Sequence, residues 1–170
     1  LLLGVESGDE DLLREYSKGV TKDQMRQAFS LCRRLGIRTL GHFIIGLPGE
    51  TEETAGKTIK FAKELDCDIA SFNIAVPVLG TPLRERALAQ GYMADEGMVF
   101  DSSDGYPVME TPRFSREQAW KWRKRAILAF YFRPAYLWRL ATQARSLYQW
   151  KLLVLNGLAL LRNLFRSRGS

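Results

Sequence analysis

The sequence predicts an α/β fold, with about three parallel β-strands that alternate with helices and an α-helical C-terminal extension. Three short apolar runs, at residues 1–7, 37–45 and 69–76, are separated by segments whose apolar residues recur at helical spacing. The connections between them are short, as parallel βαβ units require. The last third of the chain shows helical patterning throughout.

The first strand, at residues 1–7, is followed by two predicted helices. Residues 9–17 carry acids in the first turn, which the helix dipole favours. Thr21 and Gln24 have capping-box spacing and start a longer helix, which Gly36 ends because glycine tolerates positive φ. An apolar stripe predicts the buried face of that helix: Met25, Ala28, Phe29, Cys32 and Leu35.

The next strand is predicted at residues 37–45, with the turn GLPGE at its end. Thr51 or Glu52 starts a helix that runs to about Leu65, with one apolar face formed by Ala55, Ile59, Ala62 and Leu65. The third strand, at residues 69–76, leads into the turn PVLGTP. Three strands cannot close a barrel, so we expect them to be consecutive strands of a larger one.

The pattern changes after residue 88. Closely spaced Gly, Asp, Ser and Pro predict a long loop at residues 91–112, typical of a functional cover or a connector. Ser115 then caps a helix, Pro134 interrupts it so that Arg133 is the expected boundary, and a further helix runs to about Leu147. The predicted organisation is therefore a strand–helix part at 1–88, a connecting loop at 89–114 and a basic helical extension at 115–170.

Charge separates the two ends of the chain. Residues 1–112 hold 12 Lys/Arg and 18 Asp/Glu, a net charge of −6, whereas residues 113–170 hold 13 Lys/Arg and one acid, Glu117, a net charge of +12. This asymmetry predicts two regions with different surroundings. The final apolar stretch, Leu152–Leu161, is interrupted by Asn156 and Gly157 and is too short to span a bilayer.

The sequence offers few soft metal ligands. Its two cysteines, Cys32 and Cys67, stand far apart, and His42 is its one histidine. We therefore expect no iron–sulfur or zinc site within this chain, and we expect the cysteines to be reduced groups of a cytoplasmic protein. The first residues run straight into an apolar segment, so we expect Leu1 to lie within a strand of a longer protein.

Three strand ends carry the residues from which chemistry is predicted. They are Glu6-Ser7, the GLPGE turn, and Val76-Pro77 with the following GTP. In parallel α/β sheets function gathers at these carboxyl ends. A carboxylate there can accept hydrogen bonds from sugar hydroxyls or an amino group, and glycine lets a ligand approach the backbone closely. Helix caps and ordinary turns would account for the same residues.

Three motifs in order, GVES, FIIGLPGET and P-x-x-GTPL, resemble the second half of the core domain of radical S-adenosylmethionine (SAM) enzymes. The resemblance covers residues 1–88 and is greatest to the branch with an N-terminal cobalamin-binding domain, which includes magnesium-protoporphyrin cyclase-like and hopanoid-modifying enzymes. The stretch FYFRP at 130–134 also resembles the helical tail of that branch. The resemblance implies a partial (β/α) TIM-like barrel, of which this chain would hold roughly strands four to six.

The resemblance also implies roles for individual residues. Glu6, which Ser7 adjoins, matches the residue that contacts the ribose or amino group of SAM. Lys18 lies where relatives often carry a basic residue for the SAM carboxylate, although a solvated helix-end lysine is an equal alternative. Ile44, Ile45 and Gly46 match a motif beside the adenine. Val76 and Pro77 match a segment that touches the adenine, and no catalytic residue is assigned.

In the resembling family a CxxxCxxC loop holds a [4Fe-4S] cluster, which donates the electron that cleaves SAM to a 5′-deoxyadenosyl radical. This sequence lacks that loop, so we expect the cluster ligands and any cobalamin domain upstream, and we expect the 170 residues to be inactive alone while the parent protein is an enzyme. The resemblance implies radical methylation or cyclisation of a small molecule, such as a lipid or tetrapyrrole, with flavodoxin or ferredoxin as electron donor.

Several alternatives remain open at this point. The same-fold alternative is a tRNA methylthiotransferase-like radical SAM enzyme, whose terminal RNA-binding β-barrel the helical tail does not match. The tail itself is interpreted as a packed cap, as a helix on the inner membrane surface, or as a nucleic-acid-binding surface around KWRKR. A non-catalytic module working through that tail would also fit. His42, inside a strand, is a packed core histidine or a substrate contact.

Overall fold

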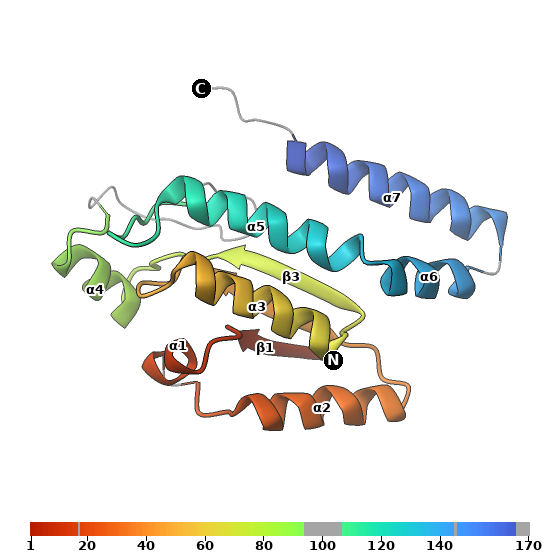
Figure 1. Ribbon diagram of the computed structural model, residues 1–170, viewed down its shortest axis with the longest axis horizontal. Helices are drawn as coiled ribbons and strands as arrows, with labels where there is room; N and C mark the ends of the chain where they lie inside the picture. The colour runs from red at the N-terminus through yellow and green to blue at the C-terminus, as the bar shows by residue number, and fades with distance from the viewer. Residues whose placement is uncertain (17, 94–106, 145, 166–170) are drawn as a thin grey trace. The chain divides into compact units, whose positions relative to one another are not determined.

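The computed structural model describes residues 1–16, 18–93, 107–144 and 146–165 of the chain, in two compact units (Figure 1). The first unit, Leu1–Ile127, holds three strands and their helices, and the second, Leu128–Ser170, holds two helices. The strands are β1 (Leu2–Glu6), β2 (Leu40–Ile45) and β3 (Ile69–Ile74). The helices are α1 (Glu10–Glu15), α2 (Lys22–Arg34), α3 (Glu52–Leu65), α4 (Pro82–Ala89), α5 (Arg116–Tyr131), α6 (Pro134–Gln143) and α7 (Leu147–Phe165).

The three strands form an open parallel sheet in the order β1-β2-β3, which confirms the predicted fold class. In register, His42 of β2 lies between Gly4 of β1 and Ser71 of β3. Alternate residues of each strand face opposite sides. The sheet therefore has one face that packs against helices and one face, hereafter the open face, that carries Leu2, Gly4, Leu40, His42, Ile44, Ile69, Ser71 and Asn73.

Apolar side chains fill the space between the sheet and its helices. Phe43 and Phe72, neighbours in register, stack with ring centroids 5.1 Å apart. Val5 and Ile45 are fully buried on the same face, against the apolar face of α3. Burial of each such side chain contributes about 1.5–3 kcal/mol. The predicted α3 face is confirmed, since its four residues are buried: Ala55, Ile59, Ala62 and Leu65.

The helix starts are where the local sequence predicts them. Thr21 forms a capping box with Gln24 at α2, and Thr51, rather than Glu52, caps α3. At α5 the Ser115 hydroxyl accepts from the Gln118 N–H at 3.1 Å. Arg133 is the N-cap of α6, with Pro134 in its first turn, so the predicted boundary is confirmed.

Several predicted bounds are wrong. Strand β2 begins at Leu40 rather than at residue 37, and β3 ends at Ile74 rather than at 76. Leu35 is 64% exposed, because α2 ends at Arg34 and leaves Leu35 as its C-cap. Helix α6 ends at Gln143 rather than near Leu147, and α4 was not predicted.

Part of the predicted loop, residues 94–106, lies outside the residues that the structure describes. The domain bounds at 88/89 and 114/115 stay predictions, and the compact units divide at 127/128. As the sequence indicates, no helix in the described part of the chain is long and apolar enough to cross a membrane.

The turn after β1 is pressed against α3 at Gly8. A Cβ at this position would lie 2.5 Å from the carbonyl oxygen of Lys57 and 2.6 Å from Cα of Thr58, both backbone atoms that cannot swing away. Only glycine therefore fits here without moving the helix.

Gly8→Ala is expected to lower the free energy of unfolding by about 1–3 kcal/mol, because the added methyl group overpacks a backbone contact. Urea unfolding measures the effect. Gly56→Ala within α3 is the control, since its Cβ would lie an ordinary 3.8 Å from Trp122 and alanine favours helix by up to ~1 kcal/mol. Equal stability of the two variants would contradict the contact.

Candidate functional site

The carboxyl ends of the three strands lie at one edge of the sheet, because the strands are parallel neighbours. Strand β1 ends at Glu6, β2 is followed by Gly46, and β3 is followed by Val76 and Pro77. Beyond the strands, Ala75 N–H still donates to the carbonyl of Ile45 at 2.8 Å, which holds the ends of β2 and β3 together. The edge at which function is expected is thus formed by all three predicted segments.

Glu6 is turned back over β1. The ladder between β1 and β2 is irregular between Gly4 and Glu6, and Glu6 has φ of +67°, a conformation that costs a non-glycine residue roughly 1–3 kcal/mol. Such irregularities re-aim a side chain. Its carboxylate occupies the space that a side chain on Gly4 would need, with Oε1 2.5 Å from the position of that missing Cβ.

Lys18 completes an ion pair at the end of β1. Its Nζ donates to Glu6 Oε1 at 2.8 Å and lies 2.9 Å from the position that a Gly4 Cβ would take. Both side chains are about a quarter exposed. The structure therefore brings together two predicted site residues that are twelve positions apart in sequence.

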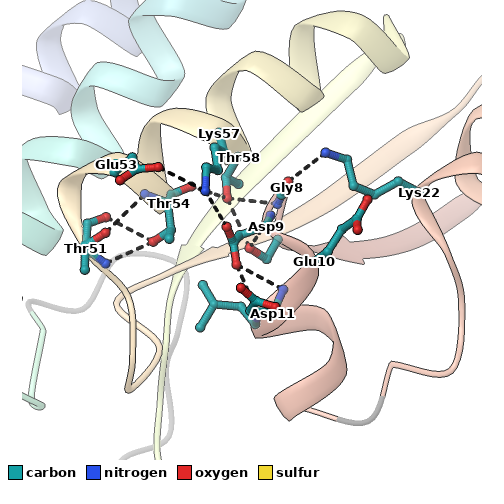
Figure 2. A network of polar contacts seen from close by, with 12 residues as sticks. Gly8, Asp9, Glu10, Asp11, Lys22, Thr51, Glu53, Thr54, Lys57 and Thr58 are labelled. Atoms are coloured by element: carbon teal, nitrogen blue, oxygen red, sulfur yellow. Dashed lines mark hydrogen bonds and ion pairs between the residues drawn. The ribbon is translucent and has the colours of Figure 1, made fainter.

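Ser7 belongs to a network that joins the β1–α1 turn to α3. Figure 2 shows Gly8, Asp9, Lys57 and Thr58 of this network. Ser7 is buried, and its hydroxyl lies 3.3 Å from that of Thr58, which also accepts from Gly8 N–H at 2.9 Å. Asp9 caps α1 and pairs with Lys57 Nζ at 2.9 Å. Although its burial raises the pKa of the Asp9 carboxyl, the Lys57 and backbone donors outweigh it and lower that pKa.

The remaining predicted residues divide between the two faces. Ile44 is half-buried and packs against an apolar cluster that includes Leu47, Ala75 and Met109, whereas Ile45 is fully buried on the helix-covered face. Gly46 follows β2 with φ of +92°, which favours glycine. Pro77 is buried and its carbonyl accepts from Arg84 at 3.3 Å.

Glu50, the last residue of the GLPGE turn, was not predicted as a site residue. It is 0% exposed, its Oε2 accepts from Gly46 N–H, and its Oε1 has no hydrogen-bond partner among the described residues. Burial raises the pKa of this carboxyl to about 8, against the lowering effect of the Gly46 and Leu47 N–H donors. The sequence gives little signal for this, because a glutamate before a helix usually indicates a solvated first turn.

The model of the radical SAM superfamily matches residues 1–62, the segment from β1 through most of α3 that contains Glu6, Lys18 and Gly46. Residues 1–62 belong to the radical SAM superfamily. This segment includes the ends of β1 and β2, whereas β3 lies beyond it.

Curated relatives extend the likeness beyond that segment. An uncharacterized methyltransferase of Pyrococcus horikoshii is 40% identical over 135 residues, which cover 79% of this chain and 29% of that protein. An anaerobic magnesium-protoporphyrin IX monomethyl ester cyclase of Cereibacter sphaeroides is 29% identical, over 81% of this chain and 22% of the cyclase. A cytidylyl-2-hydroxyethylphosphonate methyltransferase of Streptomyces wedmorensis is 27% identical, over 64% and 22%. The chain spans less than a third of each.

The radical SAM family implies two cofactors, and the described residues fit one of them. The Glu6–Lys18 pair places a carboxylate beside an ammonium. The amino-acid end of SAM carries the same two kinds of charge, so its ammonium could pair with Glu6 and its carboxylate with Lys18. Cys32 and Cys67 are both buried, and the described residues contain no group of three His, Cys, Asp or Glu side chains that could hold a metal. These residues therefore do not fit an iron–sulfur cluster.

The buried carboxyl of Glu50 predicts a pH dependence of stability. Its pKa is about 8 in the folded protein and near 4.5 when unfolded, so the folded state keeps a proton that the unfolded state releases between these values. The contribution of Glu50 is therefore present below pH 4.5 and is lost as pH rises to about 8, with a slope of up to ~1.4 kcal/mol per pH unit.

Glu50→Gln is expected to remove that slope, which urea unfolding at pH 5, 6, 7 and 8 measures. Glu64→Gln is the matched control, because its exposed carboxyl has its pKa lowered by Arg26 and titrates below this window. The same slope in wild type and Glu50→Gln would show that Glu50 titrates normally.

Proposed function

We propose that this chain is part of a radical SAM enzyme of the methyltransferase or cyclase class, and that its strand ends form part of the SAM-binding wall. One observation carries the proposal: the segment that matches the superfamily contains the Glu6–Lys18 pair at the end of β1. The likeness to named methyltransferases and to a cyclase supports the class of reaction.

Lys18 would bind the carboxylate of SAM and Glu6 its amino group or ribose. In the unliganded chain these two side chains neutralise each other, which limits the cost of holding two charges in a partly buried place. A zwitterionic ligand can replace that internal pair by two external ones without leaving either charge unpaired. The pair is thus preformed for a ligand that carries both charges.

The adenine would lie against the neighbouring strand ends. Ile44 offers a half-buried apolar surface, Gly46 lets a ligand approach the backbone, and Val76 with Pro77 borders the same edge. Ser7 and Ile45 face the helices, so we propose that they support this wall from behind. Bound SAM would supply the radical chemistry, while these residues hold and orient it.

The rest of the enzyme is proposed to lie outside this chain. We place the cluster ligands in a CxxxCxxC loop upstream of Leu1 and a cobalamin-binding domain further upstream. Residues 1–88 would form the second half of the barrel and 115–170 its helical extension. A tetrapyrrole is one candidate substrate, since one relative is named as a magnesium-protoporphyrin ester cyclase.

Glu6→Gln in the complete parent enzyme is expected to weaken SAM binding about 10- to 100-fold, the range for losing a hydrogen bond to a charged group. Equilibrium binding of SAM and formation of 5′-deoxyadenosine under reducing conditions measure it. Asp11→Asn is the matched control, because Asp11 pairs with Arg14 in an exposed place on α1.

The same assay applied to the 170-residue chain, reconstituted with iron and sulfide, is expected to yield no 5′-deoxyadenosine. Reductive SAM cleavage by this chain alone would contradict the placement of the cluster upstream. Unchanged SAM affinity in Glu6→Gln would contradict the proposed pocket.

We propose a second role for the second unit, which is binding to a membrane surface. Helices α6 and α7 leave large apolar side chains in solvent, including Trp138, which is 73% exposed, Trp150 and Leu158. The surrounding sequence is strongly basic. Aromatic and leucine side chains beside Lys and Arg are typical of helices that lie on anionic bilayers.

The chain is expected to sediment with vesicles of anionic phosphatidylglycerol at low salt. The double variant Trp138→Ala/Trp150→Ala is expected to reduce the bound fraction severalfold. Leu79→Ala is the control, because Leu79 is also an exposed apolar residue, at 52%, but lies in the first unit. Absence of pelleting, or equal pelleting of both variants, would contradict the membrane role. Salt-sensitive binding to RNA instead of vesicles would favour the nucleic-acid alternative.

A further inference from the structure

A row of polar side chains crosses the open face of the sheet. Ser71 and Asn73 of β3 lie beside His42 of β2, and the Glu6–Lys18 pair lies over Gly4 of β1. Because Gly4 is the in-register neighbour of His42, the ion pair and the imidazole stand on the same face of adjacent strands. Apart from Lys18, which lies between α1 and α2, these residues come from the three strands.

Ser71 and Asn73 orient the imidazole ring of His42. The Ser71 hydroxyl donates to Asn73 Oδ1 at 3.0 Å, so the amide turns its Nδ2 toward His42, 3.2 Å from Nδ1. An amide nitrogen can only donate, so Nδ1 accepts and the ring proton of neutral histidine stands on Nε2. Two hydrogen bonds thus fix both the tautomer and the plane of the ring.

Nε2 is the end of the row that has no partner. Within the described residues His42 makes the bond to Asn73 and no other, although its side chain is half-buried. Nε2 is not a fully buried atom, so water can reach it in the free chain and a ligand could take the place of that water. In His42, Nδ1 is bonded to Asn73 of β3, and Nε2 carries the N–H that can donate to a ligand.

We propose that His42 is a specificity-determining residue that donates its Nε2–H to a carbonyl or carboxylate oxygen of the substrate. The inference rests on the proposed function, because it places the substrate against the face on which Glu6 and Lys18 would hold SAM. A ligand that presents only donors would leave Nε2–H unpaired and is discriminated against.

Histidine labelling makes this testable without knowledge of the substrate, because the chain has a single histidine. In the 170-residue chain labelled with ¹⁵N-histidine, NMR at pH 8 is expected to show the Nε2–H tautomer. Sodium acetate, as a minimal carboxylate probe, is expected to shift the Nε2 signal saturably, whereas methylammonium chloride is not. An Nδ1–H tautomer, or equal shifts with both probes, would overturn the proposal.

Asn73→Leu removes the anchor and is expected to give a mixture of tautomers and to abolish the acetate response. Asn156→Leu is the matched substitution on the exposed face of α7, with no expected effect on His42. A wild-type acetate shift that never saturates, or one that survives in Asn73→Leu, overturns the proposal. The measurement uses neither SAM nor a cluster, so its failure is distinguishable from loss of SAM binding in Glu6→Gln.

Discussion

The turn after β1 is the constraint on which the rest of the first unit depends. Within three residues the chain buries Ser7 against α3, presses Gly8 onto the α3 backbone and turns the Glu6 carboxylate toward the opposite face. The strained φ of Glu6 is tolerable because the contacts on both sides hold it in place. A helix docked behind the sheet thereby positions a charged group in front of it.

Two carboxylates near the same edge show how environment decides what an acid can do. Glu6 is partly exposed and forms an ion pair with Lys18, so its side chain is accessible to a ligand. Glu50 is fully buried with one oxygen unpaired, and its pKa of about 8 means that it is mostly protonated at neutral pH. Glu50 therefore stabilises the turn at Gly46 rather than contributing charge to the edge.

Local features of this chain could be predicted from sequence, and features that depend on register could not. The caps at Thr21, Thr51 and Ser115 follow from residues three positions apart, and the alternation of strands and helices follows from apolar spacing. The exposure of Leu35 was missed because helical periodicity continues past the residue at which α2 ends. Family resemblance assigned Lys18 and Glu6 to one ligand but did not predict their ion pair, and the bond between His42 and Asn73 needed the alignment of β2 with β3.

The group of polar side chains within the open face argues for its function more strongly than any single residue on it. In a sheet covered on both faces by helices, strand residues on each face would be apolar, as Phe43 and Phe72 are on the covered face. Instead the other face carries His42, Ser71 and Asn73 beside Gly4. These residues lie between apolar residues at the strand starts, Leu2, Leu40 and Ile69, and Ile44, which meets an apolar cluster near the strand ends. Half-buried polar groups are costly in a core unless they are satisfied. Their internal bonds meet that cost, and Nε2 of His42, which has no partner among the described residues, is where we propose that a bound molecule adds a hydrogen bond.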